Sequence, residues 1–168
     1  MTLTAHAIVG ASIASVVPSH PVLGFALGFG SHFLLDTIPH WDYPLRSRKA
    51  DIKNPMDDDV VLNKNFIFDL FKMGSDAVFG LIVVLFLFGG FSDFHLAWAP
   101  LWGVAGALTP DALQFVYMKW RHEPMISLQK FHLWVHSRIR LDDRPALGIP
   151  LQIAIIIFFV AISKIFFP

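Results

Sequence analysis

Five apolar segments, separated by polar connections, restrict what this chain can fold into. Of its 168 residues, 55% are apolar and 15% are charged. Soluble domains carry about 25% charged residues, and disordered chains are polar and highly charged, so the composition argues against both classes. The expected apolar helices cover residues 4–17, 21–38, 65–88, 96–120 and 145–167.

These segments predict an all-α fold, an integral membrane helical bundle of about five helices. A helix needs about 20 apolar residues to cross a hydrocarbon core of about 30 Å. Residues 145–167 meet this length, with Lys164 as their one charged residue. The first segment is marginal, because about 14 residues rise roughly 21 Å. It is either a short span or a re-entrant or buried helix, which requires a covering of protein.

The chain is long enough for one domain, residues 1–168, and two long polar connections divide it. The second connection contains ISLQKFHLWVHSRIR, whose apolar face would hold Phe131, Trp134, Val135 and Ile139, as in an interfacial amphipathic helix. The expected parts are a first hairpin at 1–44, a polar loop at 45–64, a second hairpin at 65–120, the basic amphipathic segment at 121–144 and a C-terminal transmembrane helix at 145–168.

The charged residues indicate the orientation and exclude some functions. All Lys and Arg residues except Lys164 lie in or beside the two long connections, so the positive-inside rule places both connections and the N-terminus in the cytoplasm. Thirteen Lys and Arg balance thirteen Asp and Glu, and the chain has no Cys. General attraction to nucleic acid is therefore not expected, and disulfides and thiolate metal ligands are excluded.

Polar side chains inside the apolar segments are the candidates for a functional site. A charge at membrane depth is costly, so it usually faces the bundle interior and has a partner or a function. His32 and Asp36 are four residues apart and share one helical face, and His132 and His136 repeat this spacing. Two side chains one turn apart bind one ion without distorting the backbone, and imidazole with carboxylate suits zinc, iron or manganese.

A weak internal repeat relates the two hairpins. His6-Ala-Ile-Val-Gly10 matches Asp76-Ala-Val-Phe-Gly80, and Thr37-Ile-Pro-His40 resembles Leu108-Thr-Pro-Asp111. Both pairs have His in the first copy where Asp stands in the second. A duplication of this kind would make two helical hairpins face each other across the site.

Residues 31–40, S-H-F-L-L-D-T-I-P-H, resemble the H-x-x-x-D helix of zinc-dependent phospholipase C and related single-strand nucleases. In those proteins His and Asp on one helical turn bind zinc, and another His follows a proline. The chain also resembles the membrane-bound metal-dependent hydrolases, whose bacterial members include LexA-regulated inner-membrane proteins. This second resemblance covers residues 1–45 well and 70–140 loosely.

That hydrolase family has an early His, a P-D-x-D-x-P-like turn, an H-x-x-x-D segment and further His residues among transmembrane helices. By this resemblance His6 would be the early His, and residues 39–44 would form the turn, with His40 in place of the first Asp. The His-Arg-Gly…Thr-His-Ser stretch common in the family is missing. Its nearest substitute is His132-x-x-x-His136-Ser137.

The expected cofactor is a divalent metal, zinc before manganese or iron, bound as one or two ions. A carboxylate outside the ligand set, Asp42 or Asp69, would be the catalytic general base. The expected metal ligands are His6, His32 and Asp36 at one ion, and Asp76, Asp111, His132 and His136 at a second, with His40 as a further ligand.

Each of these residues also has a purely structural interpretation. His32 and Asp36 could hydrogen-bond to each other within a helix pair. Asp76 could pair with Lys72, and Asp111 could cap a helix after a proline break. The remaining interpretations are His6 as an exposed N-terminal residue, His40 and Asp42 as turn residues, His132 and His136 as polar residues at the lipid interface, and Asp57, Asp58 and Asp59 as a solvated acidic run.

The resemblance implies a membrane-bound metal-dependent hydrolase in a prokaryotic inner membrane, with its site on the cytoplasmic side. A bound divalent ion would supply activated water. The depth of the site, near the headgroups, favours a phosphoester or a phospholipid-like substrate, whose phosphate Arg46, Arg48 and Lys49 could attract. Membrane lipids are the expected partners, nucleic acid is not, and a homo-oligomer stays open.

Two non-catalytic classes stay open beside the hydrolase. The His and Asp residues could form an ion or proton relay in a small transporter, for which five helices are few unless the protein forms an oligomer. They could also hold membrane helices together, in which case the purified protein would carry no metal. An enzyme turns over its substrate in detergent, whereas a transporter needs a sealed vesicle and a gradient.

Overall fold

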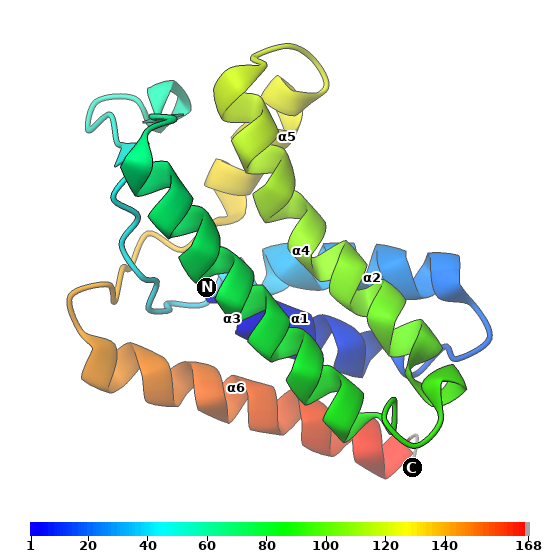
Figure 1. Cartoon of the computed structure of the whole chain (residues 1–168). Helices are drawn as coiled ribbons and strands as arrows, with labels where there is room; N and C mark the ends of the chain where they lie inside the picture. The colour runs from blue at the N-terminus through cyan, green and yellow to red at the C-terminus, as the bar shows by residue number, and fades with distance from the viewer. Residues whose placement is uncertain (167–168) are drawn as a thin grey trace.

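The computed structural model describes residues 1–166, and α-helices make up most of them. Phe167, the expected last residue of the fifth apolar segment, lies outside the described residues. Strands β1 (Arg48–Lys49) and β2 (Asp59–Val60) pair antiparallel, and two short 3-10 helices are η1 (Pro55–Asp57) and η2 (Phe94–Ala97). The α-helices, drawn in Figure 1, are α1 (Leu3–Ala14), α2 (Pro21–Asp36), α3 (Lys64–Leu87), α4 (Trp98–Lys119), α5 (Met125–Val135) and α6 (Pro145–Phe166).

Each expected apolar segment forms a helix, so the expectation of an all-α fold is confirmed. Helices α1, α2, α3, α4 and α6 correspond in chain order to the five segments, and α5 forms within the amphipathic stretch. Among the described residues, two helices, α3 and α6, are long and apolar enough to cross a membrane, whereas α1 and α2 are apolar but shorter. The helical bundle is thus present, and its placement in a membrane is a separate question.

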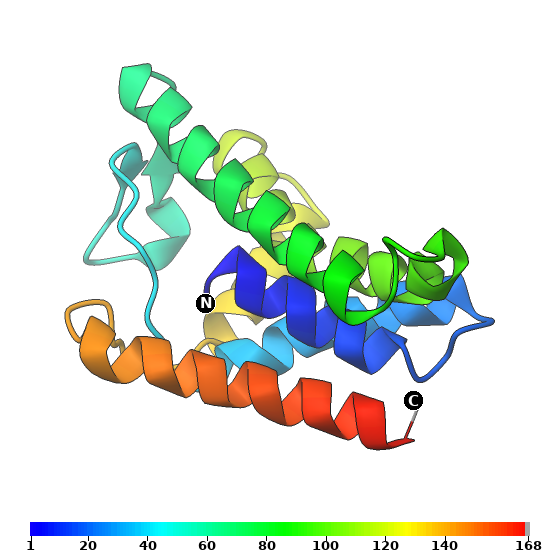
Figure 2. The same ribbon diagram turned by 60° about the horizontal axis from the view of Figure 1, so that its bottom comes forward.

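Helix α1 is short and lies at the centre of the bundle. It begins after Thr2, whose side chain accepts a hydrogen bond from Ala5 N, and it ends at Ala14, before the expected end at Val17. It contacts α2, α3, α4 and α6, and Figure 2 shows it between α3 and α6. Residues 5–12 are buried without interruption. Of the alternatives that the sequence leaves open for this short segment, α1 is therefore the buried helix.

Backbone-to-backbone packing joins α1, α2 and α4. A Cβ atom added to Gly28 of α2 would overlap the carbonyl oxygen of Gly103 on α4, and one added to Gly103 would overlap the carbonyl oxygen of Gly10 on α1. Small residues allow helices to approach this closely, as they do at membrane-helix interfaces. The close contact fixes α2 against α4 and so brings the end of α2 that carries His32 to Asp111.

Replacing Gly28 with alanine is expected to lower the free energy of unfolding by about 1–3 kcal/mol, the usual cost of overpacking. Gly30→Ala is the matched control on the same helix, because nothing lies within 4 Å of a Cβ built there. It should raise the free energy of unfolding by up to about 1 kcal/mol, since alanine is the better helix former. Unfolding of both variants in detergent measures the difference, and equal stabilities would contradict the contact.

The helices run back and forth, so that both long connections lie at one end of the bundle. Figure 1 shows the N-terminus and the connections α2–α3 and α4–α6 at one end. The short links α1–α2 and α3–α4 lie at the other end, with the end of α6. This is the arrangement expected of consecutive antiparallel helices whose two long connections share one side.

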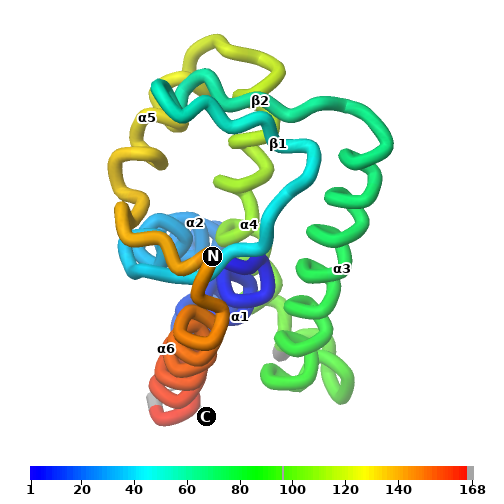
Figure 3. Tube along the Cα trace, turned by 90° about the vertical axis from the view of Figure 1, so that its left-hand side faces the viewer, coloured from blue at the N-terminus to red at the C-terminus, as the bar shows by residue number. Residues whose placement is uncertain are grey.

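The α2–α3 connection folds over the end of α4. Figure 3 shows the β1–β2 ribbon close to α4 and α5, where Val60 packs against Tyr117 and Met118. The run expected to be a solvated acidic surface is instead paired with basic residues, and the expectation is wrong for Asp58, which is buried. The pairs are Asp57–Arg121 at 3.2 Å, Asp58–Arg48 at 2.6 Å and Asp59–Lys119 at 2.7 Å.

Candidate metal centre

Histidines surround the Asp36 carboxylate at the C-terminal end of α2. Oδ1 of Asp36 lies 3.3 Å from Nε2 of His6 and 3.9 Å from Nε2 of His40. Oδ2 lies 3.2 Å from Nε2 of His32 and 2.9 Å from Nε2 of His132. All five side chains are buried. Four ring nitrogens from four segments of the chain therefore converge on one carboxylate.

Two further expected ligands lie beside these residues. Oδ1 of Asp111 is 3.8 Å from Nε2 of His32, and the ring centroid of His136 is 4.9 Å from that of His40. Three triads each have ligand atoms within 4.8 Å of one another, and His32 or Asp36 links each of the other two to the triad of His6, His32 and Asp36, so they form one centre. We call it the Asp36 cluster, and it consists of His6, His32, Asp36, His40, Asp111, His132 and His136.

Backbone hydrogen bonds hold the segment after α5 against the segment after α2. Ser137 N donates to Asp36 O at 2.7 Å, and Leu141 N donates to His40 O at 3.2 Å. The two segments are far apart in the sequence, and these bonds place His136 beside His40. The pairing therefore assembles one side of the cluster from loop residues.

Pro110 lies inside α4, one residue before Asp111, and the helix continues through it. Because proline has no N–H, the Gly106 carbonyl lacks its usual helical donor in this turn. In the same turn, the Ala107 carbonyl oxygen accepts a hydrogen bond from Nδ1 of His32 at 2.8 Å. Helix α4 thus contributes both a carboxylate and a backbone acceptor to the cluster.

Hydrogen bonds to backbone carbonyls fix the tautomers of His32, His40 and His136. A carbonyl oxygen only accepts, so Nδ1 carries the proton and Nε2 of the neutral ring carries a lone pair. The acceptors are Ala107 O at 2.8 Å, Ile38 O at 2.8 Å and Ser137 O at 3.2 Å. Outer hydrogen bonds of this kind orient metal-binding histidines. The Nε2 lone pairs of His32 and His40 then face the Asp36 carboxylate. Because both sides of this contact are hydrogen-bond acceptors, a proton or a cation between them is needed to make the contact attractive.

The nitrogens of His6 and His40 also fit a bound cation. Both ring nitrogens of His6 and Nε2 of His40 are buried and have no hydrogen-bond partner among the described residues. A buried polar atom without a partner costs about 1–3 kcal/mol. The His6 ring stacks on that of His32, with centroids 4.0 Å apart. Because the donors are imidazole nitrogens and carboxylate oxygens, the cluster could hold a metal ion.

Burial keeps the two loop histidines neutral. It lowers the pKa of His40 to about 3, and it also lowers the pKa of His136. A histidine binds a metal through its neutral ring. Neither ring therefore has to release a proton at neutral pH before it binds an ion.

Asp76, an expected metal ligand, lies outside the Asp36 cluster. Its carboxylate accepts hydrogen bonds from Leu3 N at 2.7 Å, from Thr4 N at 3.3 Å and from the Thr4 hydroxyl at 2.5 Å. Lys72, its alternative partner, donates to a loop carbonyl oxygen at 3.1 Å. Asp76 thus caps the first turn of α1 and fixes the helix that carries His6.

Asp69, an expected general base, is also committed elsewhere. Its buried carboxylate accepts from Ser47 N at 2.7 Å, from Ser47 Oγ at 2.6 Å and from Arg46 N at 3.1 Å. These bonds anchor the loop after α2 to α3. A role in proton transfer would require Asp69 to give up this anchor.

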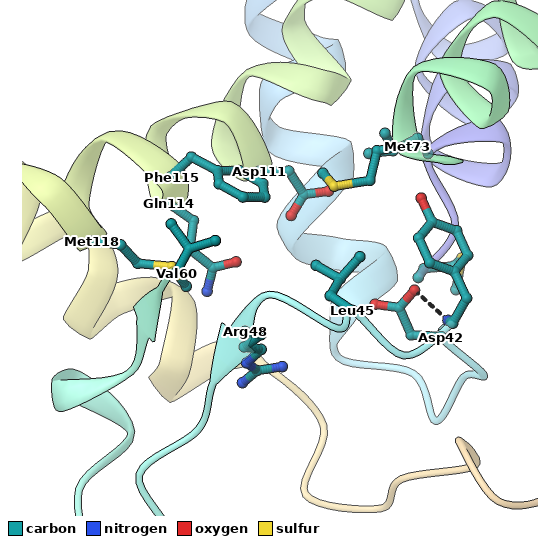
Figure 4. Close-up of a pocket in the computed structure, with 12 residues that line it drawn as sticks. Asp42, Leu45, Arg48, Val60, Met73, Asp111, Gln114, Phe115 and Met118 are labelled. Carbon is teal, nitrogen blue, oxygen red and sulfur yellow. Dashed lines mark hydrogen bonds between the residues drawn. The ribbon is translucent and has the colours of Figure 1, made fainter. Parts of the chain in front are cut away.

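A cavity of about 80 Å³ lies beside the cluster. Asp111 lines it from α4, Asp42 from the loop after α2 and Arg48 from β1, as Figure 4 shows. Burial, with the nearby carboxylates of Asp111 and Asp142, raises the pKa of Asp42 to about 6. Gln114 also lines the cavity and was not among the expected site residues, although its spacing of three from Asp111 puts both on one helical face. Because Asp111 belongs to both cavity and cluster, a molecule bound in the cavity would lie next to a bound metal.

The internal repeat pairs His40 with Asp111 and His6 with Asp76, and both members lie in the Asp36 cluster for the first pair only. His40 and Asp111 are the last residues of the matching segments 37–40 and 108–111, and both belong to the Asp36 cluster. His6 belongs to it as well, whereas its counterpart Asp76 caps α1. The duplication itself stays a prediction.

The resemblance to membrane-bound metal-dependent hydrolases stays a prediction from the motifs. No family model matches the chain, and no curated protein or solved structure matches it.

Proposed function

We propose that this protein is a membrane-embedded, metal-dependent hydrolase that cleaves a phosphoester or lipid-like substrate. One observation carries the proposal: four histidine Nε2 atoms surround the buried Asp36 carboxylate, beside a cavity that Asp111 joins to the cluster. The donor set favours zinc, with manganese or iron as alternatives. The resemblance of residues 31–40 to the H-x-x-x-D helix of zinc-dependent phospholipase C supports the same chemistry.

The two oxygens of Asp36 favour two ions over one. Each oxygen faces a different pair of histidines, so the residues on its two sides would hold two ions, which in two-metal hydrolytic sites stabilise the attacking and leaving oxygens. One group is Asp36 Oδ1 with His6 and His40, and the other is Asp36 Oδ2 with His32 and His132. His136 lies beside His40, and Asp111 lies beside His32. A single ion would leave one of these groups without a cation.

The residues around the cavity would carry out the remaining steps. Bound divalent ions would activate water and stabilise charge on phosphoryl oxygens. Asp42, with its raised pKa, is suited to take a proton from the attacking water. Arg48, held in place by Asp58, would bind a phosphate oxygen. The water oxygen bonds to phosphorus, the P–O bond to the alcohol breaks and the alcohol leaves with a proton, which gives a phosphate and an alcohol.

The surfaces of α3 and α6 support a membrane location. Both helices expose large apolar side chains, among them Phe71, Phe86 and Ile165, each more than 70% exposed. Soluble monomers rarely expose contiguous apolar patches of more than a few hundred Å². We infer that α3 and α6 face lipid in a prokaryotic inner membrane. Because all basic residues except Lys164 lie in or beside the long connections, the site would be cytoplasmic.

Helix α5 supports an interfacial position at the same end. Trp134 is 79% exposed and Phe131 is also exposed, whereas His132 on the other face is buried in the cluster. The expectation that Ile139 belongs to the same helical face is wrong, because α5 ends at Val135. An apolar face flanked by basic residues is typical of a helix that lies in the headgroup region. His132 would then reach the cluster from the membrane surface.

Detergent-purified protein and a panel of phospholipids and lipid phosphates test the hydrolase. We expect zinc- or manganese-loaded protein to release phosphate or an alcohol, a chelator to stop the reaction and added metal to restore it. His32→Ala should be folded and inactive. A protein that binds metal and cleaves nothing in the panel would contradict the proposal.

A proton or ion relay is the second candidate, because His32, His132 and Asp36 form a continuous polar chain. Nε2 of His32 lies 3.4 Å from Nε2 of His132, and both lie within hydrogen-bonding distance of Asp36 Oδ2. Such chains are typical of proton pathways in membranes. Uptake of protons or metal by sealed vesicles, together with no turnover in detergent, would favour the relay.

A further inference from the structure

An apolar groove of about 410 Å³ lies between α3 and α4. Leu70 and Met73 line it from α3, and Leu108 and Phe115 line it from α4. Apart from two aspartates, the other lining residues are apolar or glycine. The volume lies within the roughly 300–1,000 Å³ typical of small-molecule sites. The groove is therefore large enough for a ligand and has the lining of an apolar one.

Small residues keep this groove open. Gly74, Ala77 and Ala112 line it, and nothing lies within 4 Å of a Cβ built on Gly74. Glycine inside a helix is unfavourable relative to alanine, and packing in the described part of the chain does not require it at this position. A glycine at this position leaves space in the groove that a side chain would fill, and a bound ligand could use that space.

The groove adjoins the cavity beside the Asp36 cluster. Leu3, Met73, Asp111 and Phe115 line both spaces. Asp111 in turn lies 3.8 Å from Nε2 of His32. One end of the groove therefore lies at the candidate metal centre.

The groove also reaches the outer surface of α3. Leu70 and Gly74, which line the groove, line a surface hollow with Phe71 and Val78 as well. Phe71 and Val78 are exposed apolar residues on the face that would contact lipid. A hydrocarbon chain in the bilayer would thus have a direct path between α3 and α4.

From these shared lining residues we propose that the groove binds the acyl chain of a single-chain lipid phosphate, with its phosphate in the cavity beside Asp111. A cavity of about 80 Å³ has room for a phosphate, and Arg48 lines it. The groove offers one apolar path, which accommodates one chain. This substrate class rests on the proposed hydrolase function, whereas binding of the chain is measured without turnover.

Photolabelling of the full chain in detergent tests the proposal. The probe is a lysophosphatidic acid that carries a diazirine near the end of its acyl chain, and labelled residues are mapped by mass spectrometry. We expect labels on groove residues such as Leu70, Leu108 and Ala112. Ala112→Phe should reduce this labelling by about tenfold or more, because each methylene excluded from an apolar site lowers affinity by about fourfold.

Ala105→Phe is the matched control, because Ala105 is exposed on the same helix and does not line the groove. It should label like wild type. Gly74→Leu narrows the groove from α3 and gives a second test if Ala112→Phe fails to fold. Equal labelling of wild type and the folded groove variants would overturn the proposal, and so would labels confined to the hollow between α2 and α6 lined by Leu34 and Phe158.

The binding and catalytic results separate the two proposals. Groove labelling in a protein that cleaves no lipid phosphate would support the chain site and contradict the hydrolase. Cleavage of lipid phosphates with labels elsewhere would support the hydrolase and overturn the chain site. Both outcomes are read from the same purified protein.

Discussion

Asp36→Asn is expected to release the bound metal and abolish hydrolysis. Asparagine keeps the size of the side chain but removes its negative charge, and it places an NH2 group where one oxygen faces histidine nitrogens. Metal affinity should fall by more than about 100-fold, the upper end of the cost of losing an outer-shell partner. Equilibrium dialysis with zinc, followed by an activity assay, measures both losses.

Asp69→Asn is the matched control for this experiment. Asp69 is as well buried as Asp36, but its partners are Ser47 and Arg46 rather than histidines. Its replacement should lower the free energy of unfolding by about 1–3 kcal/mol and leave metal affinity unchanged in the folded protein. Equal loss of metal from both variants would contradict ligation by Asp36, because the loss would then follow destabilisation.

Asp42→Asn is expected to lower turnover by about 10²–10⁴-fold, the usual effect of removing a general base, without loss of metal. Asp42 lines the cavity with Asp111 and lies outside the cluster. Asp143→Asn is the control, since Asp143 is an exposed carboxylate of the same loop region and is not among the residues that line the cavity. It should leave turnover close to wild type. An Asp42→Asn variant with wild-type turnover would exclude the proposed proton transfer.

The helices were predictable from the sequence because their signals are local. Apolar runs that end at Pro18 and Pro39 mark α1 and α2, and a run of apolar residues marks α6. The backbone contacts at Gly10, Gly28 and Gly103 were not predictable. They depend on which helix faces which, and a single sequence carries no record of that pairing.

Members of the cluster were predictable where their spacing along a helix or the free-energy cost of burying them pointed to a site. His32 and Asp36 share a face because they are one turn apart, and the expense of burying His6 in an apolar segment identified it as a candidate. Asp76 and Asp69 met the same criterion of cost, but the structure gives them backbone donors from distant segments. Such donors are present at every residue, so sequence does not distinguish a carboxylate that binds them from one that binds a metal.

Metal content of the wild-type protein tests the central claim most directly. Protein purified in detergent at neutral pH, supplemented with zinc, manganese or iron and then washed, is analysed by mass spectrometry beside the His32→Ala/Asp36→Ala double variant. The geometry of the Asp36 cluster predicts one or two equivalents of metal in the wild type and loss of that metal in the folded double variant. Wild-type protein that holds no metal after supplementation would contradict the metal centre and leave the cluster as a network of hydrogen bonds.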